Sequence, residues 1–252
     1  MGKAKLVQEV VLRNNLETIP NIYDLKKIGA GHDGIVFKYG NRALKLLKYD
    51  IHTREYKGLM IFKKAIFFQQ NLSLKRIENP IDIMLDVNGV YIGFVTNYLD
   101  DITSQEKIGT PRYKDTGQFT CGDLICAARE LEEDFDNLTQ NNVLAKDINR
   151  GSYIYTTDFI HLCDMDKYVI QNGGNLEQLN RINLQFVIAK FLYFEMLKSV
   201  DLSQSQKNHL SKWVRKQSHS YNYFDQLEEE VRYDYAMPLC DYAKEKVKIL
   251  LP

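Results

Sequence analysis

The sequence has little of what marks several classes of protein. Its 252 residues include four cysteines, five prolines and one tryptophan, and Lys plus Arg balances Asp plus Glu at 33 each. The cysteines form no C-x-x-C pair and have no histidine at zinc-like spacing, so we expect reduced thiols and no structural metal. With a formal charge of zero, no global field draws the chain to nucleic acid, and we expect no nucleic-acid partner.

Long apolar runs are also scarce. The most apolar stretch, residues 186–197, is interrupted by Lys190 and Glu195 and is too short to cross about 30 Å of hydrocarbon, so we interpret it as a core helix. The first residues carry charge where a signal peptide needs an apolar core, and Leu6 stands where a myristoylation signal has Ser or Thr. We therefore expect a cytoplasmic protein with no membrane span and no lipid anchor.

The overall composition is typical of a folded protein, because 44% of the residues are hydrophobic and 26% are charged. Between residues 23 and 99, short apolar runs bounded by Gly or Asn predict antiparallel strands, and a helical pattern follows the third of them. Asn88-Gly89 predicts a tight hairpin turn between the last two strands. The strands are expected over 25–28, 34–39, 42–47, 81–87 and 90–98, and the helix over 52–70.

After residue 100 the pattern changes to helices. One amphipathic helix is predicted over 123–139, and a second short hairpin is predicted from strands at 153–155 and 159–162. Further helices are expected over 176–199, 203–217 and 223–250. Strands first and helices last predict an α+β chain. We expect a β-rich lobe over residues 1–99 and a mainly helical lobe over residues 100–252.

A glycine-rich turn lies between the first two predicted strands. Gly29, Gly31 and Gly34 form a G-x-G-x-x-G pattern that is followed by Val36. A dinucleotide-binding fingerprint needs a helix directly after these glycines, whereas residues 35–39 predict a strand. The pattern favours a strand-turn-strand flap whose backbone N–H groups approach phosphate oxygens. An ordinary hairpin turn without a ligand is the alternative.

The next predicted strand carries a lysine in a position that suits phosphate binding. Lys45 follows Gly34 by eleven residues and has apolar neighbours. Its ammonium group can neutralise charge on the α and β phosphates of a nucleotide, and Glu55 on the following helix is the candidate partner that holds it. The alternative is a lysine that extends to solvent from a strand edge, as we expect of Lys48.

These features, in this order, resemble the protein-kinase-like superfamily. Its catalytic loop reads H-R-D-x-x-x-x-N, and its metal loop reads D-F-G after a hairpin. In this chain Lys146-Asp147 follows a predicted helix, Ser152 stands at the position of the Asn, and Asp164-Met165-Asp166 follows the second hairpin. The resemblance covers roughly residues 23–200 and implies a bilobal kinase-like fold, with an antiparallel sheet and one helix in the first lobe.

The resemblance also implies roles for individual residues. Asp147, with Lys146 beside it, would accept or guide the proton of an attacking hydroxyl group. Asp164 would bind Mg²⁺ (or Mn²⁺) at the phosphates of ATP, and Ser152 and Asp166 are the further candidate metal ligands.

Adenine recognition is expected at the connection between the lobes. Backbone groups around Asn97 and Leu99 would bind the adenine edge, and Ala43 and Leu162 would cover its faces as apolar side chains. This completes the implied nucleotide site, which also includes the glycines, Val36, Lys45 and Glu55.

The chain departs from the family pattern at several positions. Ala145 replaces the His that supports the catalytic loop, Ser152 replaces Asn, and Met165-Asp166 replaces Phe-Gly. No A-P-E segment follows, which argues against a long phosphorylated activation loop.

Three functions therefore stay open. The first is an ATP-dependent phosphotransferase that acts on a hydroxyl group of a protein or a small molecule. The second is an inactive pseudokinase that binds a nucleotide, or a protein partner through its helical lobe. The third is an unrelated α+β binding protein in which the glycines are turns and the aspartates are caps.

Overall fold

The structure is a computed structural model of the chain. At residues 51–59, 155, 213–217 and 250 only the backbone is described. It divides into two compact units, Met1–Ser73 with Glu78–Leu99 and Leu74–Ile77 with Asp100–Pro252. The residues that the structure describes are 8–14, 16–31, 33–48, 51–100, 119–148, 152–156, 158–188, 197, 200, 202–217, 227–229, 231 and 234–250.

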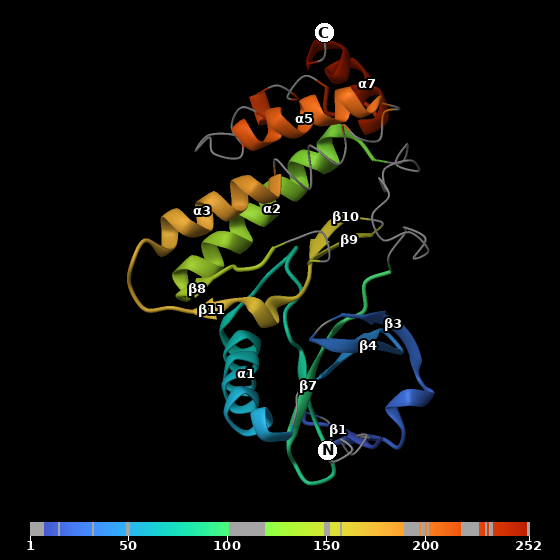
Figure 1. The fold of residues 1–252 in the computed structure, drawn as a ribbon, viewed down its shortest axis with the longest axis vertical. Helices are drawn as coiled ribbons and strands as arrows, with labels where there is room; N and C mark the ends of the chain where they lie inside the picture. The colour runs from blue at the N-terminus through green and yellow to red at the C-terminus, as the bar shows by residue number, and fades with distance from the viewer. Residues whose placement is uncertain are drawn as a thin grey trace. The chain divides into compact units, whose positions relative to one another are not determined.

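The first unit is built on a seven-stranded antiparallel sheet, with strands in the order β2-β1-β6-β7-β5-β4-β3 (Figure 1). Helix α1 (Ile51–Asn71) packs against β6 and β7. The five strands and the helix that the sequence predicts are confirmed, with small shifts at their ends. The strands are β1 (Val10–Leu12), β2 (Glu17–Ile19), β3 (Lys26–Ala30), β4 (Gly34–Tyr39), β5 (Arg42–Leu47), β6 (Asp82–Leu85) and β7 (Tyr91–Asn97).

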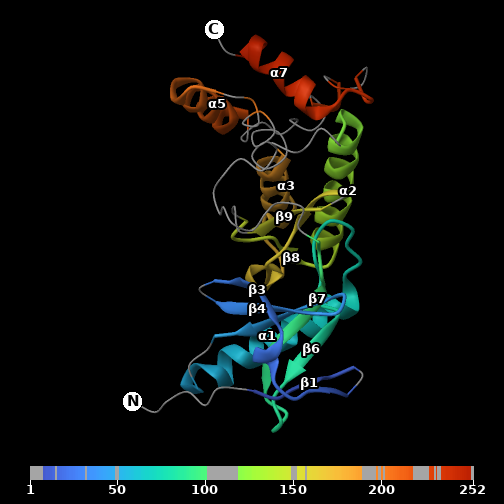
Figure 2. The same ribbon diagram turned by 90° about the vertical axis from the view of Figure 1, so that its right-hand side faces the viewer.

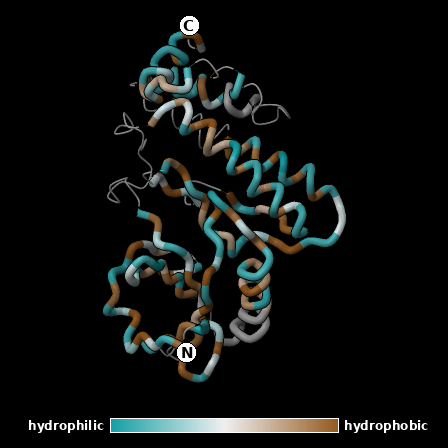
Figure 3. The backbone as a smooth tube through the Cα atoms, turned by 180° about the vertical axis from the view of Figure 1, so that it is seen from behind, coloured by the Kyte–Doolittle hydropathy of each residue, from teal (hydrophilic) through white to brown (hydrophobic). Residues whose placement is uncertain are grey.

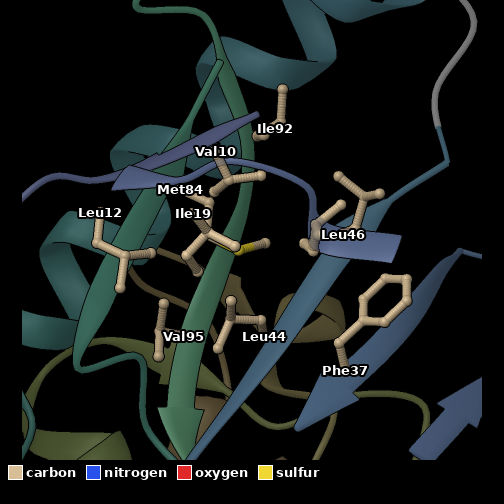
Figure 4. Packing of buried hydrophobic residues seen from close by; sticks show 10 residues of the cluster. Val10, Leu12, Ile19, Phe37, Leu44, Leu46, Met84, Ile92 and Val95 are labelled. Carbon is tan, nitrogen blue, oxygen red and sulfur yellow. The ribbon is translucent and has the colours of Figure 1, made fainter. Parts of the chain in front are cut away.

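The N-terminal hairpin β1–β2 was not predicted, and it encloses one face of this sheet. Phe37, Leu44 and Val95 lie opposite one another on β4, β5 and β7, so their side chains share a face. The hairpin and the 3-10 helix η1 (Ile22–Asp24) add apolar side chains to the same buried cluster, which Figure 4 shows gathered together. The members that they contribute are Val10, Leu12, Ile19 and Ile22.

A polar contact holds the hairpin in place. The carboxylate of Glu17 on β2 accepts hydrogen bonds from the Tyr39 hydroxyl at 2.6 Å and from the Arg42 guanidinium at 3.0 Å. These bonds join β2 to β4 and β5, which lie several strands away in the sheet. The cluster face is therefore closed off, and the opposite face of β4 and β5 is the one that carries Lys45.

The second unit is mainly helical. Helix α2 (Cys121–Gln140) begins at a capping box formed by Thr120 and Asp123. It packs against α3 (Leu176–Val187), and Figures 1 and 2 show the two helices side by side. Hydrophobic and hydrophilic residues alternate along both (Figure 3), as expected for helices that bury one face. The other elements are β8 (Val143–Leu144), β9 (Tyr153–Thr156), β10 (Phe159–Leu162), η4 (Met165–Lys167), β11 (Val169–Ile170), α5 (Gln204–Gln217) and α7 (Leu239–Leu250).

The second hairpin, β9–β10, is confirmed, but one predicted helix is interrupted. A turn occupies residues 235–236, and Pro238 forms an isolated bridge with Thr120 before α7 begins at Leu239. Proline lacks the N–H that an interior helical position needs, which explains the interruption. Most of the expected core helix at 186–197 lies outside the described residues. Among the helices that the structure describes, none is long and apolar enough to span a membrane.

Candidate functional site

The glycine-rich flap is a β-hairpin formed by β3 and β4. Gly29 lies opposite Val36 in the ladder, and the Gly31 N–H donates to the Gly34 carbonyl at 2.9 Å. Strand β4 begins at Gly34, so the chain continues as a strand where a dinucleotide-binding fingerprint would continue as a helix. The predicted strand-turn-strand arrangement is therefore what the described residues form.

The three glycines differ in what surrounds them. A Cβ atom at Gly34 would lie 2.7 Å from the Leu46 carbonyl oxygen, so the close approach of β5 requires glycine there. A Cβ at Gly29 would make an ordinary contact with Val36 at 3.7 Å, and a Cβ at Gly31 would meet nothing within 4 Å. Packing thus explains Gly34, and it does not require glycine at the other two positions.

Lys45 lies in the middle of the sheet on the face opposite the hydrophobic cluster. Val36, Lys45 and Phe94 are directly opposite one another on β4, β5 and β7. Ala43 lies two residues before Lys45 on the same strand and therefore shares that face. The half-buried Lys45 ammonium lies 5.7 Å from the Phe94 ring centroid. The side chain of Glu55 falls outside the described part of α1, so its pairing with Lys45 stays a prediction.

The end of β7 is held against the turn between β4 and β5. Asn97 pairs with Arg42, and the Tyr98 N–H donates to the Asn41 carbonyl at 2.9 Å. The Lys38 ammonium lies 3.6 Å from the centroid of the Tyr98 ring, a cation–π contact. Asn97 and Leu99 thus stand where the first unit ends, and their contact with adenine stays a prediction.

The predicted catalytic residue Asp147 and the predicted metal ligand Asp164 have an unusual backbone conformation. Asp147 has a φ of 58° and Asp164 a φ of 68°, in the left-handed region that few non-glycine residues adopt. The described non-glycine residues with positive φ number five, the others being Leu16, Asn142 and Phe159. Such conformations persist where surrounding structure holds them, and they concentrate at functional sites.

Ser152 connects these two aspartates. Its hydroxyl donates to the Asp147 carbonyl at 3.2 Å, and its own carbonyl accepts the Cys163 N–H at 2.7 Å, one residue before Asp164. Ser152 is 4% exposed, so this frame is an internal part of the second unit. The structure therefore links the predicted catalytic loop to the predicted metal loop through the residue that the sequence places at the Asn position.

The remaining predicted residues of this unit lie around that frame. Lys146 and Asp147 are exposed. Asp166 lies in the first turn of η4, which is anchored by the buried Met165. Leu162 is fully buried on β10, and its role as a cover for adenine stays a prediction.

Two asparagines on α3 support the catalytic loop, and the sequence analysis missed them. The Asn180 side chain accepts the Ala145 N–H at 3.0 Å and donates to the Val143 carbonyl at 2.8 Å and the Thr139 hydroxyl at 2.9 Å. The Asn183 amide donates to the Ala145 carbonyl at 2.7 Å. Both backbone groups of Ala145 are thus held two residues before Asp147. The available signal was an asparagine pair at i and i+3 on a helix with a buried face.

A buried polar cluster lies at the start of this unit. The Asp134 carboxylate, 1% exposed, accepts the backbone N–H groups of residues 75–77 at 2.7–2.9 Å. Burial raises its pKa, against the lowering effect of these bonds. Arg76 donates to the Asp158 carbonyl at 2.5 Å, and the His161 ring lies 3.1 Å from the Asp158 carboxylate. Burial lowers the pKa of His161, although its bond to Asp158 acts in the opposite direction.

Comparison with known proteins identifies the fold. No protein-family profile matches the sequence, and no curated protein matches it either. In contrast, 1465 chains of solved structures match the three-dimensional structure. One is the PknI kinase domain of Mycobacterium tuberculosis, with a TM-score of 0.53 and 12% identity, covering 92% of this chain and 100% of that domain. The chain has a protein-kinase-like fold.

The kinase-like fold confirms the fold that the sequence predicts, an α+β bilobal arrangement with a β-rich first part. It therefore differs from the unrelated α+β fold of the third alternative. At 12% identity the likeness concerns the fold alone. The function of this kinase-like chain must therefore be argued from its own residues.

Proposed function

We propose that this chain is an ATP-dependent phosphotransferase that transfers the γ-phosphate to a hydroxyl group of a protein or a small molecule. The observation that carries the proposal is the frame in which Ser152 bonds to the left-handed Asp147 and to Cys163, the residue before the left-handed Asp164. Holding two non-glycine residues in this conformation costs about 1–3 kcal/mol each, which a functional requirement would explain. On a kinase-like fold, two carboxylates so placed favour phosphoryl transfer.

Phosphoryl transfer depends on alignment and charge neutralisation more than on covalent chemistry. In the first unit, the Lys45 ammonium would neutralise phosphate charge, and the open backbone at Gly31 would admit phosphate oxygens. In the second unit, the exposed Asp147 would accept the proton of the acceptor hydroxyl, with Lys146 beside it.

The candidate metal ligands suit a hard cation. Asp164 and Asp166 offer carboxylate oxygens and Ser152 a hydroxyl oxygen, and Mg²⁺ or Mn²⁺ prefers such oxygen donors. Within the described residues, no group of three or more His, Cys, Asp or Glu gathers as a metal cluster. Phosphate oxygens of the nucleotide would complete the coordination. When bound, the cation would neutralise phosphate charge.

The pseudokinase alternative drew on Ala145 and Ser152. The loop that contains Ala145 has its own support, because Asn180 and Asn183 bind the backbone that a His side chain would otherwise help to hold. Ser152 keeps a bridging position between the two aspartates. Neither departure therefore removes the frame that catalysis would need, and activity is the better-supported function.

Calorimetric titration with ATP, with and without Mg²⁺ or Mn²⁺, tests binding, and release of labelled phosphate to water tests turnover. We expect Asp147→Asn to reduce turnover by about 10²–10⁴-fold while the dissociation constant for ATP stays within about twofold. Lys45→Met should weaken binding, and Asp164→Ala should remove the dependence on the metal. Asp241→Asn, on the exposed first turn of α7, is the matched control and should change neither quantity.

The outcomes separate the alternatives. ATP binding without turnover at either metal would support the pseudokinase. No binding of any nucleotide would refute both functions. Full turnover in Asp147→Asn would refute the role of that carboxylate.

A further inference from the structure

The tip of the glycine flap is held by a lysine that the sequence analysis expected to extend to solvent. Lys48 follows the last residue of β5, and its ammonium donates to the Gly31 carbonyl at 2.9 Å. Its backbone N–H donates to the Asp33 carbonyl at 2.8 Å. One residue therefore binds both sides of the turn, and its side chain is exposed while doing so.

The flap has a second feature at the same point. A Cβ atom at Gly31 would meet nothing within 4 Å, so space is open directly beside the peptide that Lys48 binds. A lysine ammonium is a flexible point charge, and an anionic oxygen attracts it through full charge as well as through a hydrogen bond, whereas a neutral carbonyl attracts it only through its dipole. An anion that enters the space beside Gly31 would therefore compete for the Lys48 ammonium.

We propose that Lys48 is a second phosphate-contacting lysine, whose ammonium exchanges the Gly31 carbonyl for a terminal phosphate oxygen of a bound nucleotide. The proposal rests on the function proposed above, because it names a further residue of the same site. Lys45 and Lys48 would act differently: Lys45 projects from the middle of the sheet beside Phe94, whereas Lys48 reaches the tip of the flap. Release of the Gly31 carbonyl would also free the tip to follow the phosphates.

This exchange predicts how affinity depends on the number of phosphates. AMP has a single phosphate, so a contact with the terminal phosphate of ATP should be absent or weaker in its complex. Because an exposed ammonium makes the contact, high salt should screen it. A role of Lys48 in merely stabilising the flap would instead give a loss of affinity that does not depend on salt, because no exposed charge would contact the phosphate.

The test is isothermal titration of the full chain with MgATP, MgADP and AMP at about 0.05 M and about 0.5 M salt. Lys48→Met is compared with Lys48→Arg, which retains the charge, and with Lys26→Met, which removes an exposed charge from β3 of the same flap. We expect Lys48→Met to raise the dissociation constant for MgATP about fivefold at low salt and that for AMP less than about twofold. Lys48→Arg and Lys26→Met should stay close to wild type.

The possible results separate this proposal from the function on which it rests. If the wild-type chain binds no nucleotide, the proposed function is wrong and this inference fails with it. If the wild-type chain binds MgATP and Lys48→Met binds it like Lys26→Met, the inference alone is overturned. An equal loss of affinity for MgATP and AMP would also overturn it, because a contact with the terminal phosphate cannot weaken AMP binding as much. A loss for MgATP that is the same at both salt concentrations would overturn it as well, because the lysine would then only shape the flap.

Discussion

Removing the amide of Asn180 should loosen the catalytic loop from inside the second unit. Asn180→Leu keeps a side chain of similar size but cannot bind the Ala145 N–H or the Val143 carbonyl. Each is a buried backbone group, and leaving such a group without its partner costs about 1–3 kcal/mol. Burial of the leucine side chain offsets about 1–2 kcal/mol. With central values of about 2 kcal/mol for each of the two groups and about 1.5 kcal/mol for the offset, we expect the free energy of unfolding to fall by about 2–3 kcal/mol.

Asn183→Ala is the matched comparison, because it removes one hydrogen bond to the same residue from a partly buried position. It should cost about 1 kcal/mol. If the two asparagines position Asp147, Asn183→Ala should also lower kcat for ATP turnover while the dissociation constant for ATP stays unchanged, a split that general destabilisation would not produce.

Urea unfolding followed by circular dichroism gives the stabilities, and single-turnover kinetics below the unfolding transition gives the rate. A loss of less than about 0.5 kcal/mol in Asn180→Leu would refute the reasoning. Such a result would mean that the buried amide does not hold the loop.

Two further predictions concern the flap and the polar cluster. Gly34→Ala places a Cβ 2.7 Å from the Leu46 carbonyl oxygen and should destabilise the first unit by about 1–3 kcal/mol. Gly31→Ala places a Cβ in open space at a residue without a positive φ, so it should change stability by less than about 1 kcal/mol. Equal melting temperatures for the two variants would contradict this prediction. Burial lowers the pKa of His161 from its usual value of 6.5. Between 6.5 and the lower folded-state pKa, the unfolded chain therefore binds a proton that the folded chain does not, and the free energy of unfolding should fall as the pH drops through this range. His161→Gln should reduce this slope in unfolding measurements between about pH 5 and 8, and an unchanged slope would show that other groups cause it.

Local patterns predicted a large part of the first unit. Strands β4 and β5 begin and end at the predicted residues, because alternating apolar positions and flanking glycines determine strands over a few residues. A turn also forms at Asn88-Gly89, with Gly89 at a φ of 75°, although the loop spans residues 86–90 and is longer than the predicted two-residue turn. These features depend on neighbouring residues and are visible in any short window of the sequence.

The elements that were missed depend on distant partners. Strands β1 and β2 have three residues each, too few for a periodic signal, and β1 exists because Val11 and Leu12 pair with Leu85 and Met84 of β6. The break before α7 did have a local signal in Pro238. Here the sequence contained the information, and the helical pattern on both sides obscured it.

The sequence alone determined the types and order of the chemical groups: a glycine turn, a lysine on a central strand, and two aspartates in later loops. Their order was enough to suggest a kinase-like fold, which the structural comparison bears out. Only the tertiary structure decided that Ser152 joins Asp147 to the loop of Asp164, that Asn180 holds the loop from α3, and that Lys48 binds the flap. The physical reason is that each of these contacts is a directional hydrogen bond between groups that only the folded chain brings together.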